Sequence, residues 1–152
     1  MTSIFAFLVG LGALKGYQVK GLDVKITVSV KNIGDFAGKE VVQLYLGKPS
    51  NRLSNVYQEL VAFKKTKILK PDELQNIELS FSLADFASYD EKYIAYILES
   101  GNYVLKLGNC SRNTEDILCL VLQQDLDISA HEHVCNKILT FTDLETKVTH
   151  EI

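Results

Sequence analysis

Apolar and polar residues alternate along the middle of this chain. Between residues 24 and 31, four β-branched apolar residues at even positions alternate with lysine, threonine and serine at odd positions. The segment 77–83 repeats the pattern with isoleucine, leucine and phenylalanine. Period-two alternation predicts strands that bury one face and expose the other.

Further strand signals follow, separated by turn sequences rich in glycine, proline, asparagine or aspartate. These other predicted strands span 40–46, 59–68, 93–98, 103–107 and 117–122. About seven short strands, each burying one face, are typical of two stacked sheets. The sequence therefore predicts an all-β, immunoglobulin-like two-sheet β-sandwich.

The same pattern predicts the domain limits and the core. Residues 1–21 read as an apolar N-terminal segment or linker, 22–123 as the sandwich, and 124–152, where the alternation stops, as a C-terminal linker or tail. We expect both extensions to be irregular. The residues predicted to fill the core are Val28, Val30, Leu44, Ile77, Leu79, Phe81 and Leu105.

Composition narrows the possible partners. A length of 152 residues predicts one domain. A net charge of −3 disfavours nucleic acid, because nucleic-acid-binding proteins usually carry a basic face. The apolar run 4–14 is too short to span a bilayer comfortably, so no membrane partner is expected. It could be the core of a signal peptide, although no lysine or arginine precedes it.

The cysteines indicate the compartment. The chain has an odd number of cysteines, namely Cys110, Cys119 and Cys135, and no two of them have C-x-x-C spacing. Free thiols in a reducing, cytoplasmic compartment are the simplest interpretation. One disulfide with a spare thiol, in a secreted protein, is the alternative.

Two groups of residues are candidates for chemistry. His131, His133 and Cys135 would share one face of a strand and could bind zinc, but no fourth ligand is evident, so no metal site is predicted. Asp85 and Asp90 could form a general acid/base pair. Capping of turn N–H groups explains these aspartates better. No catalytic residue and no cofactor are therefore expected.

Two features of the strands concern tertiary contacts. Tyr103 follows a glycine turn and can act either as a tyrosine corner or as ordinary core packing.

The strands at 40–46 and 59–68 are apolar on both faces, although a sandwich needs only its inner faces apolar. The surplus predicts a candidate interface at Val41, Gln43, Tyr45 and Phe63. Loops or the N-terminal segment covering this face are the alternative.

Several segments in order resemble a known family. They are 32–45 (NIGDFAGKEVVQLY), 59–65 (ELVAFKK), 69–73 (LKPDE), 101–103 (GNY) and 108–112 (GNCSR). With their spacing they resemble the fibronectin-III-like module of family 3 glycoside hydrolases, which are mostly β-glucosidases and β-xylosidases. The resemblance implies a fibronectin-III-like sandwich.

The resemblance also bears on activity. In that family a carboxylate nucleophile on a barrel domain and a separate acid/base carboxylate hydrolyse the glycosidic bond. None of the 19 acidic residues here matches those positions. The chain thus resembles a detached or truncated non-catalytic module that braces catalytic domains. Its expected partners are those domains or a second copy of itself.

Two other functions stay open at this point. A carbohydrate-binding module would stack sugars on exposed aromatic side chains, and seven tyrosines leave room for this. A metal-assisted hydrolase would use His131, His133 and Cys135.

Overall fold

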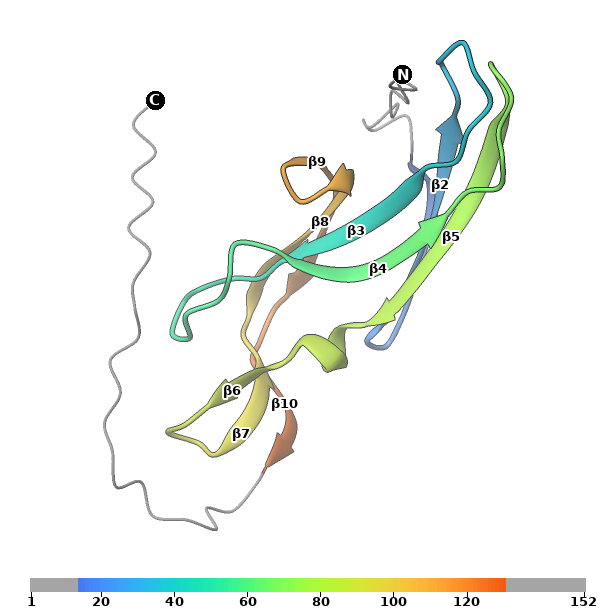
Figure 1. The fold of residues 1–152 in the computed structure, drawn as a ribbon. Coiled ribbons are helices and arrows are strands. Elements are labelled where there is room, and N and C mark those ends of the chain that lie inside the picture. Colours follow the sequence, from blue (N-terminus) through green and yellow to red (C-terminus); the bar gives the residue numbers. More distant parts are fainter. Residues whose placement is uncertain (1–13, 131–152) are drawn as a thin grey trace.

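The computed structural model describes residues 14–130, and these form ten strands and one short 3₁₀ helix (Figure 1). The elements are β1 (Leu14–Lys20), β2 (Asp23–Lys31), β3 (Val41–Gly47), β4 (Glu59–Lys65), β5 (Leu74–Ser82), η1 (Leu83–Phe86), β6 (Ser88–Asp90), β7 (Ala95–Leu98), β8 (Gly101–Cys110), β9 (Asn113–Leu122) and β10 (Leu126–Ala130).

Two antiparallel sheets form the sandwich. One has the strand order β1-β2-β5 and the other β4-β3-β8-β9. A third sheet, β10-β7-β6, lies at the end of the sandwich beyond η1 (Figure 1). The all-β sandwich predicted from the sequence is confirmed.

The core lies between the two larger sheets. All seven residues predicted to fill it are buried there. Leu69, which lies between β4 and β5, joins them, and so does Leu98 from the small sheet. Alternation therefore identified the inward faces of β2, β3, β5 and β8 correctly, because each strand of a sandwich can bury only one side against the opposite sheet.

Three strands were not predicted, namely β1, β6 and β10. β1 lies within the predicted N-terminal linker, and β10 lies within the predicted C-terminal tail. Most side chains of β1 are exposed, and the strand pairs with β2 at the free edge of its sheet. An edge strand of this kind needs no apolar alternation, since backbone hydrogen bonds to its neighbour position it.

β4 departs from simple alternation. Leu44 faces Ala62 and Tyr45 faces Leu60, so the register shifts and Val61 is the extra residue of a β-bulge. Strict alternation would place Leu60 with Ala62 on one face and Val61 with Phe63 on the other, and this expectation is wrong. The bulge turns Val61 and Ala62 toward the core, while Leu60 and Phe63 are exposed.

Two turns depend on a particular backbone conformation. At Lys70–Glu73 the Glu73 amide donates to the Lys70 carbonyl over 3.0 Å, and Asp72 has a positive φ. Gly101 has φ of 139°, and a Cβ there would lie 2.8 Å from Pro49 Cβ. Glycine is therefore required at position 101 by both backbone conformation and space.

The described residues contain no membrane-spanning helix and two free thiols. None of residues 14–130 belongs to a helix long and apolar enough to cross a membrane. Cys110 and Cys119 are free, as predicted, and both are exposed, while Cys135 lies outside the described residues.

The core packing predicts a large effect at Phe81. Its ring is 9% exposed and meets the ring of Phe86 edge to face at 6.0 Å. Phe81→Ala should lower the free energy of unfolding by roughly 3–5 kcal/mol, because it leaves a cavity. Phe36→Ala, at a residue that is 61% exposed, is the control and should cost less than about 0.5 kcal/mol. Urea denaturation measures the free energy of unfolding of both variants. Equal losses in Phe81→Ala and Phe36→Ala would contradict this description of the core.

Candidate functional site

The predicted interface residues lie on one surface, which we call the outer face. It comprises Val41, Gln43 and Tyr45 of β3 together with Leu60 and Phe63 of β4. Phe63 is paired with Gln43 across the strands, and Leu60 with Tyr45. Leu60 was not predicted as part of this surface, and only the bulge at Val61 brings it there.

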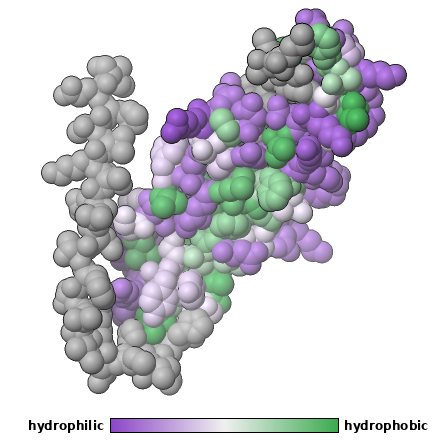
Figure 2. Space-filling model, viewed as in Figure 1, coloured by the Kyte–Doolittle hydropathy of each residue, from purple (hydrophilic) through white to green (hydrophobic). Residues whose placement is uncertain are grey.

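Exposure divides the outer face into two parts. Phe63 is 68% exposed and Leu60 is 46% exposed, while Val41 and Gln43 are half-buried. Figure 2 shows hydrophobic residues over β4 in the middle of this view, bordered by hydrophilic ones. Tyr45 is only 7% exposed. The expectation that Tyr45 is uncovered is therefore wrong.

The chain between β3 and β4 passes close to the strand partner of Tyr45. Its residue Tyr57 accepts a 2.9 Å hydrogen bond from Lys106 Nζ, and Lys106 is the strand partner of Tyr45. Gln58 Nε2 donates to the Ser111 carbonyl over 2.7 Å. This segment therefore crosses the outer side of β8. The Tyr45 hydroxyl donates to Gln43 Oε1, and burial raises the pKa of Tyr45.

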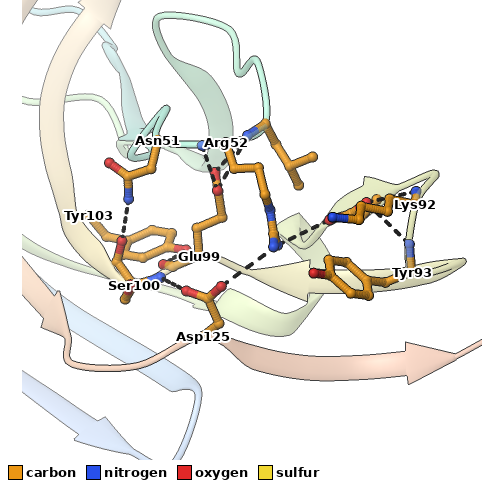
Figure 3. Close-up of polar contacts among 10 residues, drawn as sticks. Asn51, Arg52, Lys92, Tyr93, Glu99, Ser100, Tyr103 and Asp125 are labelled. Atoms are coloured by element: carbon orange, nitrogen blue, oxygen red, sulfur yellow. Dashed lines mark hydrogen bonds and ion pairs between the residues drawn. The ribbon is translucent and has the colours of Figure 1, made fainter.

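A second group of polar residues lies beside the small sheet, and we call it the Arg52 cluster (Figure 3). It comprises Arg52, Asp90, Tyr93, Glu99 and Asp125. Arg52 Nη2 lies 3.0 Å from Asp90 Oδ2 and 3.7 Å from Asp125 Oδ2. The guanidinium lies 5.0 Å from the centre of the Tyr93 ring, which is a cation–π distance.

Glu99 holds the loop that carries Arg52. Its carboxylate is buried, and Oε1 accepts hydrogen bonds from the Arg52 amide at 2.8 Å and the Leu53 amide at 3.3 Å. The Glu99 carbonyl accepts from the Tyr103 hydroxyl at 2.8 Å. Tyr103 is thus a tyrosine corner and is also packed in the core. Burial, followed by the charges of Glu99 and Asp125, raises the pKa of Tyr103 to about 12.

The two remaining carboxylates have structural partners. Asp90 Oδ1 accepts from the Lys92 and Tyr93 amides, so the predicted capping role of Asp90 is confirmed. Asp125 accepts from the Ser100 amide at 2.8 Å, and that bond lowers the pKa of Asp125. Asp85 lies exposed in η1, and a capping role for it stays a prediction.

No pattern in the sequence identifies the Arg52 cluster. Arg52 lies in the β3–β4 loop, and Asp90 and Tyr93 lie in the β6–β7 hairpin. Glu99 precedes β8, and Asp125 follows β9. A glutamate directly before a glycine turn carries no pattern that predicts its burial. The only local signal was the aspartate at the corner near residue 90.

The metal hypothesis concerns residues beyond this region. His131, His133 and Cys135 lie outside the described residues. Among residues 14–130 there is no group of three His, Cys, Asp or Glu side chains placed to hold a metal ion.

The Arg52 cluster predicts a stability cost when Arg52 is removed. Asp90 Oδ2 is buried and accepts no well-aligned hydrogen bond from the described residues, so Arg52 is its counter-charge. Arg52→Met should lower the free energy of unfolding by about 1–3 kcal/mol. Arg112→Met, at an exposed residue, is the control and should be neutral. A neutral Arg52→Met in chemical denaturation would show that the ion pair contributes nothing.

Tyr103 predicts a dependence of stability on alkaline pH. The folded pKa of about 12 lies above the unfolded value of about 10, so its contribution is complete below pH 10 and is lost as the pH rises toward 12. Tyr103→Phe should lose about 1 kcal/mol at neutral pH through the missing hydrogen bond. Its stability should then fall less between pH 10 and 12. Parallel pH profiles for the two proteins, measured by thermal unfolding, would contradict this assignment.

Comparisons with known proteins identify the module. Residues 40–111 match the family model for the fibronectin type III-like domain. The chain is 36% identical over 123 residues to a β-glucosidase of Ruminococcus albus, covering 78% of this chain and 13% of the relative. Beta-glucosidase A of Butyrivibrio fibrisolvens is also 36% identical, over 120 residues, covering 74% of this chain and 14% of the relative.

Solved structures agree. A β-glucosidase from Paenibacillus barengoltzii superposes with a TM-score of 0.74 at 32% identity, over 79% of this chain and 14% of that one. The chain thus spans a small part of the length of these relatives. It belongs to the fibronectin type III-like modules found in family 3 β-glucosidases.

Proposed function

We propose that this chain is a non-catalytic accessory module that braces the catalytic domains of a family 3 glycoside hydrolase of the β-glucosidase type. The observation that carries the proposal is the exposed apolar pair Leu60 and Phe63 on the outer face. The core between the sheets is filled without them. Their exposure therefore serves something outside the sandwich.

The energetics favour a covered outer face. Apolar surface removed from water contributes about 25 cal/mol per Å². Contacts between domains of one protein typically bury about 600–1,500 Å², which is enough to hide a strip of this size. The neighbouring half-buried Val41 would extend the contact along β3.

The end of β4 indicates how a partner would approach. β4 is an edge strand of its sheet, and Lys64 and Lys65 at its end are exposed. Charged residues on an edge strand oppose pairing with a further strand. We therefore expect contact through side chains of the outer face and not through extension of the sheet.

The comparisons support an accessory role. The chain matches 13% and 14% of the two bacterial β-glucosidases, and no acidic residue of the chain matches the catalytic carboxylates of the resembled family. We expect the purified chain to leave aryl β-glucosides intact. Turnover that survives repurification and disappears in Asp90→Asn would contradict the proposal.

A chimera tests the bracing role. The matching segment of the R. albus β-glucosidase is replaced by residues 14–130, and thermal unfolding and β-glucosidase activity are measured. Phe63→Ser should lower the melting temperature of the chimera by several degrees, because about 1–2 kcal/mol of interface burial is lost. Phe36→Ser, at another exposed phenylalanine, is the matched control.

The isolated chain provides the second readout. With the outer face uncovered, the 152-residue chain should self-associate, and Phe63→Ser should reduce this in analytical ultracentrifugation. The bracing role is refuted if Phe63→Ser changes neither the chimera nor the self-association. Tyr45→Lys is unsuitable for this test, since Tyr45 is buried and the substitution would unfold the module.

A further inference from the structure

A pocket lies at the small sheet, away from the outer face. It has a volume of about 350 Å³ and is lined by Arg52, Tyr93, Ala95, Ile97, Asp125 and Asp127. Ala95 and Ile97 of β7 are buried and form an apolar floor. Arg52, Tyr93 and Asp125 converge from different elements around it (Figure 3).

The charges around the pocket restrict the ligand. The Arg52 guanidinium lies 5.0 Å from the centre of the Tyr93 ring and Lys92 Nζ lies 5.3 Å from it, so cations are already present at that ring. A further cation would meet like charge there. The carboxylates of Asp125 and Asp127 repel anions. Mixed charges of this kind favour a neutral ligand that both accepts and donates hydrogen bonds.

The side chains match the chemistry of a sugar. Carboxylates accept hydrogen bonds from hydroxyl groups, and a guanidinium donates to hydroxyl oxygens. Asp127 pairs with Ile97 through the backbone, while its carboxylate makes no ion pair or hydrogen bond with the other described residues, so the acceptor capacity of the side chain is free. Tyr93 is 55% exposed, and its ring offers apolar surface to the C–H groups of a pyranose.

The size agrees with a small ligand. Ligand pockets usually measure about 300–1,000 Å³ and combine apolar walls with few convergent polar groups. A pocket of about 350 Å³ lies at the lower end of that range, which suits one sugar ring and not a long chain buried throughout.

We propose that this pocket is a carbohydrate-binding subsite that takes one pyranose unit of a neutral saccharide. The exposed Tyr93 ring provides the apolar surface, Asp127 and Asp125 accept from ring hydroxyls, and Arg52 donates. The site uses no residue of the outer face. Binding of sugar and bracing of catalytic domains can therefore fail independently.

Titration of the 152-residue chain with methyl β-D-glucopyranoside and cellobiose tests the site. Changes of the amide chemical shifts in NMR spectra measure the binding. We expect saturable binding with a millimolar dissociation constant, typical of a small open site. The shifts should centre on Tyr93, Ala95 and Asp127. Tyr93→Ala and Asp127→Asn should each weaken binding about tenfold or more.

Matched controls separate the site from general effects. Tyr17→Ala, at a β1 tyrosine that is 57% exposed, and Glu115→Gln, at an exposed β9 carboxylate, should keep the affinity of the unchanged chain. Asp127 is exposed, so Asp127→Asn keeps the fold even if Tyr93→Ala perturbs the hairpin. The proposal is overturned by absence of saturation, by equal binding of glycerol or tetramethylammonium, or by undiminished binding in Asp127→Asn.

Discussion

Glu99 connects the parts of this module that surround the sandwich. Its carbonyl accepts the hydroxyl of the buried Tyr103, and its carboxylate accepts two amides of the β3–β4 loop. A buried carboxylate is stable only when such donors replace water. The path of the loop follows from this constraint. With the loop held, Arg52 reaches Asp90 and Asp125.

The same loop shapes the outer face. After Arg52 it continues to Tyr57 and Gln58, which bind Lys106 and Ser111 on the outer side of the four-stranded sheet. Tyr45 of the outer face is buried, while Leu60 and Phe63 on the edge strand are exposed. The exposed apolar surface of the outer face therefore lies around β4.

The module presents two chemically different surfaces. The outer face is apolar with lysines at its border, a composition that favours contact with another folded domain. The pocket by the small sheet has an apolar floor and charged walls of both signs, a composition that favours a small polar ligand. They lie on separate elements, so one module can carry both without competition for the same residues.

Alternation in the sequence determined the sandwich and its core, because the inward faces of stacked sheets must be apolar at every second residue. Motif order determined the resemblance to family 3 modules. Tertiary structure decided three other things. It added β1 and β10, which sheet pairing stabilises without apolar alternation. It placed the bulge at Val61, where one extra residue reverses the faces of Leu60 and Val61.

Finally, it assembled the Arg52 cluster and the pocket. The residues of the cluster and of the pocket lie far apart in the sequence. No local pattern relates Arg52, Tyr93 and Asp127 to one another. Only the docking of the β3–β4 loop on Glu99 brings Arg52 to the small sheet. Periodicity in the sequence shows which side of a strand is buried, whereas the meeting of distant loops depends on hydrogen bonds between residues that are far apart in the sequence.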